Sequence, residues 1–307
     1  MNGARAKRIL VTGATGFIGR HCIPALIEKG FEVHALSSRG AQLPNVDSHE
    51  ADLMNPGATA GLLSELTPTH LLHLAWYAEP GLFWNSRENL AWVAASLNLY
   101  RAFVENGGRR MVAAGTCAEY DWNYSVLDEY ETPIKPATLY GVSKAALHSV
   151  LTRAADLDGL ALAWGRVFFL YGPGEKPGRL VSDVIRGLLQ GRTVETTSGL
   201  QKRDFMHVAD VAGAFAALCD SDAQGSFNIA SGEARPLHEL LKAIGDITGR
   251  PDLLRVGARP MPPGEPPCLA AATTRLTQEV GFCPRHDLES GLGDAIQWWQ
   301  THGLPEG

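Results

Sequence analysis

The sequence predicts an α/β fold, a doubly wound parallel sheet joined to a smaller mixed α/β domain. Apolar runs at residues 9–11 and 69–76 lack the polar alternation of a strand with one wet face, as expected of a sheet covered on both sides. Stretches with helical spacing of apolar residues follow them. The chain has 307 residues, 45% of them hydrophobic, which is enough for a sizeable core and a second domain.

Three glycines, each three residues from the next, follow the first apolar run. Gly13 permits a tight turn, Gly16 lets a phosphate approach the backbone, and Gly19 lets a helix lie against the strand. The free N–H groups at the start of that helix favour a pyrophosphate, although an ordinary strand–turn–helix would also fit. The pattern predicts a Rossmann dinucleotide site formed by Gly13, Thr15, Gly16, Phe17, Ile18 and Gly19.

The end of the second expected strand, residues 31–36, indicates which dinucleotide is bound. An acidic residue there would accept hydrogen bonds from the adenosine ribose and select NAD, but the sequence has Ser37, Ser38 and Arg39. Arg39 can pair with a 2′-phosphate and the serines can donate to it, which favours NADP over NAD. The alternative is that Arg39 is a solvated loop cation.

Two further strand ends should face the cofactor, since ligands lie at the carboxyl ends of such strands. After a short third strand, the carboxylate of Asp52, beside Leu53, could accept from the adenine amino group, and capping of the next helix is the alternative. The strand at residues 69–76 ends in three residues that we expect beside the cofactor: Leu74, Ala75 and Trp76.

The segment that follows is expected to wall the substrate pocket. Residues 77–84 are an aromatic loop with Pro and Gly, and Trp84 is its candidate substrate contact. A long helix is predicted at residues 89–105, ending near Gly107 and Gly108. Its amphipathic face is explained most simply by core packing.

A tyrosine and a lysine four residues apart form the second informative pattern. Pro136 precedes Tyr140 and helix formers follow Lys144, so the two side chains share one helix face. A lysine ammonium and the positive ring of a cofactor would favour the phenolate and lower the Tyr140 pKa from its usual value near ~10. Tyr140 could then move a proton near neutral pH. Thr116, after a strand at residues 110–114, could hydrogen-bond the same substrate oxygen.

Composition and charge argue against several classes of function. The net charge of −6 argues against non-specific binding to nucleic acid or to an anionic membrane. No apolar run approaches the ~20 residues of a membrane span, and we expect no signal peptide in the short basic start. The five cysteines are scattered without a Cys-x-x-Cys pair, so we expect no metal site and no disulfide framework, and a cytoplasmic location.

Together these motifs resemble those of the extended short-chain dehydrogenases/reductases, in the NAD(P)-dependent sugar epimerase/dehydratase family. The resemblance covers nearly the whole chain and includes residues 12–19, 52–53, 73–75, 116, 140–144, 171–173 and 203–208. It implies that Tyr140 is the acid/base, that Lys144 binds the nicotinamide ribose and tunes Tyr140, and that Thr116 orients the substrate oxygen. It also implies a homodimer formed through the helices that begin near residues 89 and 140.

The resemblance also identifies candidate substrate contacts. Arg203 matches an arginine that nucleotide-sugar enzymes place near the substrate nucleotide, and Arg179 and Arg259 are further candidates for diphosphate contacts, although each could be a surface ion pair. Phe169 stands where many members have an asparagine, and it cannot make that hydrogen bond. Cys117 stands where dehydratases usually have an Asp, which disfavours dehydration. It could be a second acid/base or a small buried side chain.

These features favour an NADPH-dependent reductase of a nucleotide-linked 4-keto-6-deoxy sugar, with Tyr140 as proton donor. The alternatives are a nucleotide-sugar epimerase with tightly bound NAD, a reductase of a non-nucleotide carbonyl compound, and a non-catalytic dinucleotide sensor, which the intact catalytic set argues against. The resemblance places the NAD(P)-binding domain at residues 1–166 and about 203–230. It places the substrate-binding domain at about 167–202 and 231–307.

Overall fold

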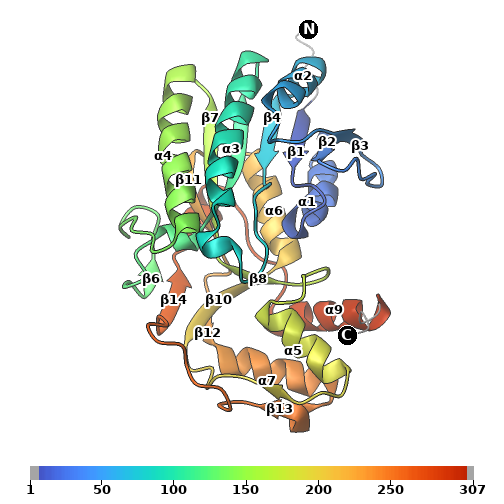
Figure 1. The fold of residues 1–307 in the computed structure, drawn as a ribbon, viewed down its shortest axis with the longest axis vertical. Coiled ribbons are helices and arrows are strands. Elements are labelled where there is room, and N and C mark those ends of the chain that lie inside the picture. The colour runs from blue at the N-terminus through green and yellow to red at the C-terminus, as the bar shows by residue number, and fades with distance from the viewer. Residues whose placement is uncertain (1–6, 303–307) are drawn as a thin grey trace.

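A seven-stranded parallel sheet forms the larger part of the molecule (Figure 1). The computed structural model describes residues 7–302. The strand order is β11-β7-β5-β4-β1-β2-β3, and every neighbouring pair is parallel. The strands are β1 (Arg8–Thr12), β2 (Glu32–Ser37), β3 (Asp47–Glu50), β4 (His70–His73), β5 (Arg110–Thr116), β7 (Ala161–Val167) and β11 (Gly225–Ile229).

Helices cover both faces of this sheet, as the apolar strands predict. On one face α1 (Phe17–Glu28) packs against α6 (Val208–Cys219). On the other, α3 (Glu88–Glu105) lies between α2 (Pro56–Leu66) and α4 (Leu139–Asp158). The order of strands and helices is that of a doubly wound Rossmann fold, so the predicted fold class is confirmed.

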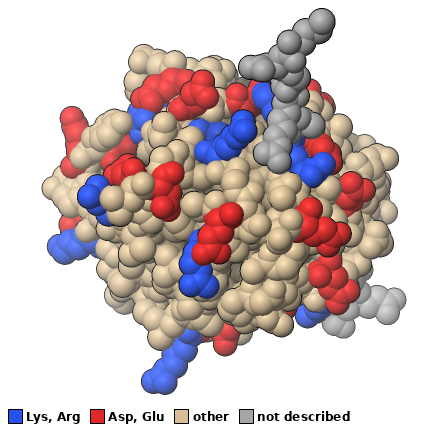
Figure 2. Space-filling model, turned by 90° about the horizontal axis from the view of Figure 1, so that it is seen from above, with Lys and Arg blue, Asp and Glu red and all other residues tan. Residues whose placement is uncertain are grey.

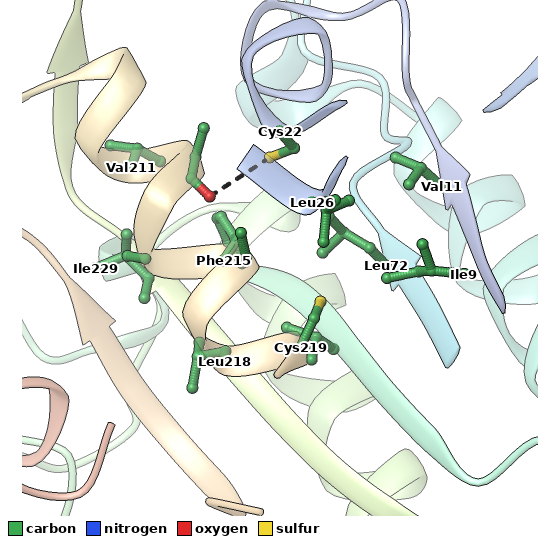
Figure 3. Packing of buried hydrophobic residues seen from close by; sticks show 14 of the residues in the cluster. Ile9, Val11, Cys22, Leu26, Leu72, Val211, Phe215, Leu218, Cys219 and Ile229 are labelled. Atoms are coloured by element: carbon green, nitrogen blue, oxygen red, sulfur yellow. Dashed lines mark hydrogen bonds between the residues drawn. The ribbon is translucent and has the colours of Figure 1, made fainter. Parts of the chain in front are cut away.

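The contact between α1 and α6 is close and apolar. Leu26 of α1 and Phe215 of α6 are fully buried and meet over the strand residues Ile9 and Val11 (Figure 3). The buried Cys22 thiol lies 4.0 Å from the carbonyl oxygen of Ala212 and donates to it. Because α6 comes late in the chain and α1 early, this core ties the two halves of the sequence together.

A second, mixed sheet lies beyond the carboxyl ends of β5 and β7. Its order is β12-β10-β14-β6, with β8 beside β10. The strands are β6 (Val126–Leu127), β8 (Phe169–Tyr171), β10 (Lys202–His207), β12 (Ala234–Pro236) and β14 (Cys268–Ala271). Three helices pack together beside it, α5 (Leu180–Leu189), α7 (Leu237–Thr248) and α9 (Leu288–Thr301). A short pair, β9 (Val194–Glu195) with β13 (Leu254–Arg255), completes this part, whereas α8 (Thr274–Gln278) packs against β11 of the first sheet.

Several boundaries differ from those expected. The strand at 69–76 ends at His73, and the strand expected at 110–114 continues to Thr116. The composition of residues 161–173 predicts one strand running into a turn. The structure has two strands in different sheets there, since β7 ends at Val167 and β8 starts at Phe169. Both β6 and β10 belong to the second sheet, so the return to the first sheet begins with α6. The division into two domains remains our proposal.

The surface carries charges of both signs. On the end seen in Figure 2, Lys and Arg side chains alternate with Asp and Glu, with uncharged surface between them. This face therefore offers no broad basic patch of the kind that binds nucleic acid. Within residues 7–302, no helix is both long and apolar enough to cross a membrane.

Candidate active site

The three glycines form the tight turn that their spacing predicts. Gly13 has a φ of +70°, and a Cβ there would lie 2.8 Å from the backbone nitrogen of Ala75. The Gly16 N–H donates to the Gly13 carbonyl oxygen over 2.9 Å, and a Cβ on Gly19 would collide with that same oxygen. The turn thus leaves a backbone surface at the start of α1 that a phosphate can approach, and the residues present fit a dinucleotide.

The rest of the predicted cofactor surface lies around this turn. Thr15 is exposed, and Phe17 and Ile18 are half-buried at the start of α1. Leu74, Ala75 and Trp76 follow β4, whose last residue pairs with Thr12 of β1.

The buried His73 holds this strand end in place. Its Nδ1 lies 2.7 Å from the Thr12 hydroxyl and its Nε2 lies 2.9 Å from the Ser96 hydroxyl. Burial lowers the pKa of His73 to about 3, and the nearby Lys144 charge adds to this effect. His73 is therefore neutral at physiological pH and braces β4 against β1 and α3.

The residues expected at the adenosine end lie at the carboxyl edge of β2 and β3. The Ser37 hydroxyl accepts from the Ala41 N–H over 2.9 Å, while Ser38 and Arg39 are exposed. Asp52 is exposed and accepts from the Met54 N–H over 2.9 Å, and Leu53 is buried in the core. The Asp52 carboxylate therefore shapes its own turn. The N-cap of α2 is Asn55, so the alternative that Asp52 caps this helix is wrong.

Thr116, Tyr140 and Lys144 come together where β5 meets the start of α4. The Thr138 hydroxyl caps α4 by accepting from the Gly141 N–H over 3.2 Å, which places Tyr140 and Lys144 on its first turns. The Lys144 ammonium donates to the Ala114 carbonyl oxygen over 2.8 Å. The three candidate catalytic residues thus share one region of the structure.

Burial acts on the pKa of Tyr140 against the effect expected of the ammonium and the cofactor ring. Burial raises it above the ordinary value, and a side-chain hydrogen bond with Thr116 only partly opposes this. The Lys144 ammonium donates to the Ala114 carbonyl oxygen and lies 3.8 Å from the centroid of the Trp76 ring. Burial lowers the pKa of Lys144 itself to about 7, against the Glu119 charge, which raises it.

Aromatic rings surround the Tyr140 phenol, as the composition of the 77–84 loop suggests. The rings of Phe83 and Trp84 stand edge-on to Tyr140, with centroids 4.9 and 5.9 Å away. Trp122 lies 6.4 Å from Trp84, and its indole N–H donates to the Cys117 carbonyl oxygen over 2.8 Å. Trp122 was missed by sequence reasoning, and its only signal was an aromatic residue shortly after Thr116.

Cys117 is a buried thiol rather than a reactive one. Its side chain is 6% exposed, and burial raises its pKa to about 12, helped by the Glu119 charge. The thiol is protonated at neutral pH. This supports the interpretation of Cys117 as a small buried side chain over a second acid/base.

The candidate substrate arginines lie in different environments. Arg203 is buried, pairs with the Glu265 carboxylate and lies 5.6 Å from the Phe169 ring centroid. It also lines a cavity of about 380 Å³ beside β10. The Arg179 guanidinium lies 5.3 Å from the centroid of the Phe83 ring, which also contacts Tyr140. Arg259 is exposed beside β9, where its N–H donates to the Thr196 carbonyl oxygen.

A cluster of His207, Asp210 and His286 could in principle hold a metal ion. Asp210, however, already accepts from the N–H groups of Arg285 and His286 and from the His286 ring, each over 3.0 Å. The carboxylate therefore braces the loop before α9 against the start of α6.

The chain matches the family model described as the NAD-dependent epimerase/dehydratase family over residues 9–230. The UDP-glucose 4-epimerase of Corynebacterium glutamicum is 26% identical, with 97% of this chain and 96% of that protein covered. The UDP-glucuronate 4-epimerase 1 of Arabidopsis thaliana is 27% identical, with 96% and 77% covered. These matches extend over nearly the whole chain, including both sheets.

Solved structures agree with this assignment. The UDP-glucose 4-epimerase of Thermotoga maritima, solved with UDP-glucose, is 25% identical with a TM-score of 0.86, covering 96% of this chain and 99% of its own. MoeE5, solved with UDP-glucuronic acid and NAD, is 31% identical with a TM-score of 0.80 and the same coverage. The chain therefore belongs to the NAD-dependent epimerase/dehydratase family and is an enzyme of the extended short-chain dehydrogenase/reductase type.

Proposed function

We propose that this enzyme is a nucleotide-sugar 4-epimerase that works with NAD, the alternative among the functions considered from the sequence. The observation that carries the proposal is the meeting of Thr116, Tyr140 and Lys144 beside the glycine turn, in a chain that matches UDP-sugar 4-epimerases over nearly its whole length. The relatives described above are UDP-sugar 4-epimerases, which favours this function over the keto-sugar reductase.

Tyr140 is the proton carrier in this proposal. Its phenolate would take the proton of the sugar 4-hydroxyl as the carbon that bears this hydroxyl gives up a hydride. It would return the proton when a hydride is delivered to the other face of that carbon. When bound, the oxidised nicotinamide supplies the hydride acceptor and a positive charge that favours the phenolate. Thr116 hydrogen-bonds the reacting oxygen, and Lys144 holds the ribose next to Tyr140.

The substrate diphosphate is assigned to Arg203. Its guanidinium is buried and pairs with Glu265, and a substrate diphosphate would take the place of this carboxylate. Arg179 and Arg259 are additional candidates for the same group. Phe169 offers a ring face, and Trp84 an aromatic wall, against which a nucleotide or sugar ring can pack.

Arg39 favours a second candidate function, that of an NADPH-dependent reductase. This exposed guanidinium follows β2, where a 2′-phosphate would lie. Both functions are tested together by denaturing the purified protein, identifying the released nicotinamide by mass spectrometry, and following UDP-hexoses by NMR. Interconversion of 4-epimers without added cofactor supports the epimerase. Consumption of NADPH on a 4-keto sugar, without interconversion, supports the reductase.

We also propose a homodimer through α3 and α4. Large apolar side chains are exposed on these two adjacent helices: Leu90, Val142, Val150 and Leu157. Such an apolar surface is unfavourable in water. In a dimer with two-fold symmetry, the same surface of a second copy would cover it. Light scattering on wild type and on Val150→Glu tests it, with a dimer becoming a monomer as the expected result.

A further inference from the structure

Glu119 is a charged side chain buried directly behind the candidate catalytic residues. It lies in the short helix η2 (Cys117–Glu119) that follows β5, and it is 0% exposed. Its Oε1 accepts from the Thr116 N–H over 2.8 Å. The carboxylate therefore fixes the backbone that presents the Thr116 hydroxyl to the substrate.

The same carboxylate is connected to Lys144 through an indole ring. The Trp164 N–H donates to Glu119 Oε1 over 3.0 Å, and the Trp164 ring centroid lies 6.0 Å from the Lys144 Nζ. An indole that donates to an anion is polarised toward its ring, which strengthens its attraction for a cation. Lys144 thus lies within reach of both the carboxylate field and the ring that the carboxylate polarises.

The residues around Glu119 balance its charge and leave room for its contact with Trp164. Arg166, 2% exposed, donates from Nε to Glu119 over 2.8 Å, so the buried carboxylate has a counter-charge. Arg166 also donates to the Tyr120 hydroxyl, which donates in turn to Asn228. A Cβ on Gly115 would collide with the Trp164 indole and lie 2.6 Å from Glu119. Only glycine leaves room for the contact.

We propose that Glu119 is a positioning residue of the catalytic centre, which fixes Thr116 and, through Trp164, keeps the Lys144 ammonium charged beside Tyr140. This inference rests on the proposed function, since it assigns Glu119 a role in the same proton transfer. Burial lowers the pKa of Lys144 to about 7, and Glu119 is the group that opposes this. Without the carboxylate, Lys144 would lose its proton at lower pH.

The other charged or titratable groups near these residues act differently. Around Lys144, His73 on β4 is neutral, because burial lowers its pKa to about 3. Around Glu119, the thiol of Cys117 is protonated, and the pKa values of Tyr120 and Tyr140 are raised by burial. His148 beside Arg166 is also neutral, with a pKa lowered to about 4 by burial. Arg166 is the charge paired directly with Glu119. Farther out, Glu129 lies near Tyr120, Arg203 and Asp204 lie near Cys117, and Arg179 lies near Tyr140.

The test is the titration of Lys144 in wild type and in Glu119→Gln. Full-length protein is labelled with ¹³C at lysine Cε, the Lys144 resonance is identified by its loss in Lys144→Met, and its shift is followed with pH. Glu129→Gln is the matched control, since Glu129 is also a partly buried carboxylate that accepts a backbone N–H, from Asn228 over 2.8 Å. We expect the Lys144 midpoint to fall by about half a pH unit or more in Glu119→Gln and to stay in place in the control.

The double variant Glu119→Gln/Arg166→Gln guards against misfolding, because it removes both buried charges together. It should show a smaller fall of the midpoint in the same direction, because the repulsion between Arg166 and Lys144 is lost as well. An unchanged Lys144 midpoint in folded Glu119→Gln, or an equal fall in Glu129→Gln, would overturn the inference. The pH profile of epimerisation supplies the second readout, with its alkaline limb shifted by the same amount. If the midpoint falls but wild type converts no nucleotide sugar, the proposed function fails and the role of Glu119 in charging Lys144 stands.

Discussion

The Lys144 ammonium donates a 2.8 Å hydrogen bond to the carbonyl oxygen of Ala114, thirty residues earlier in the chain. Ala114 lies in β5 and Lys144 in α4, so the bond sets the distance between a strand end and a helix start. Thr116 follows on the strand and Tyr140 precedes on the helix by one turn. A single contact therefore aligns the two groups that are to hold one substrate oxygen.

Tyr140→Phe should remove turnover while leaving cofactor affinity largely intact. The ring keeps its edge-on contacts with Phe83 and Trp84, and only the proton-carrying hydroxyl is lost. General acid–base groups contribute about 10²- to 10⁴-fold to rate, so we expect kcat to fall by at least about 100-fold. Steady-state kinetics and cofactor titration measure the two effects. Turnover close to that of wild type would refute the role of Tyr140.

His73 should make the protein less stable in acid. Burial lowers the pKa of His73 to about 3 in the folded protein, while the unfolded chain has the ordinary value of about 6.5. Below pH 6.5 the His73 ring therefore gains a proton when the protein unfolds. The contribution of His73 to the free energy of unfolding is complete above about pH 6.5 and is lost as the pH falls toward 3. At pH 5 the loss is about 2 kcal/mol. Urea unfolding at pH 5 and 7 should show a smaller pH effect for His73→Gln, whereas exposed His302→Gln should behave as wild type.

Gly19→Ala should disrupt the turn that is to carry the cofactor. The added Cβ would collide with the Gly13 carbonyl and lie 2.8 Å from the Ala14 Cα, both of them backbone. We expect the nicotinamide content of the purified protein, measured by absorbance and mass spectrometry, to fall sharply. Gly61→Ala in α2 is the control, because its Cβ meets nothing within 4 Å. It should stabilise the protein by up to about 1 kcal/mol.

Arg203→Met should weaken binding of a nucleoside diphosphate. Methionine keeps apolar contact with Phe169 and removes the charge, and hydrogen bonds to charged groups are worth about 1.5–3 kcal/mol. Calorimetry with UDP should show Kd raised by about tenfold or more, and exposed Arg192→Met should have no effect. Glu265→Gln should move Kd the other way, since it removes the competing anion. Equal affinities in all variants would exclude Arg203 from the site.

Arg39→Ala decides between the two cofactors. If Arg39 pairs with a 2′-phosphate, its loss should weaken NADP binding by about tenfold and leave NAD binding unchanged. If Arg39 is a solvated cation, as the proposed epimerase would have it, neither affinity should change. Fluorescence titration of the apo-protein with both dinucleotides separates these outcomes.

Local patterns in the sequence were sufficient to predict those parts of the site whose residues lie within a few positions of one another in the chain. The glycine turn and the pair of Tyr140 and Lys144 each depend on spacing inside one strand–turn–helix or one helix. The spacing does not show the burial of Tyr140 by Phe83, Trp84 and other residues distant in sequence, which raises its pKa.

Contacts between distant segments could not be read in this way. Glu119 and Arg166 are 47 residues apart, and nothing in the order of residues marks them as a pair. The pairing of Arg203 with Glu265 spans 62 residues. Likewise, residues 161–173 have a continuous β pattern, yet they are divided between two sheets at Phe168, because β8 pairs with β10.

The chain passes between its two sheets several times. It goes out to β6, returns to β7, goes out to β8 and β10, returns to β11, and goes out again to β12 and β14. No single cut therefore separates a cofactor half from a substrate half. A hybrid enzyme with a transplanted substrate lobe would need several matched splice points. Each splice would have to preserve the packing of α1 on α6 that holds the early and late segments together.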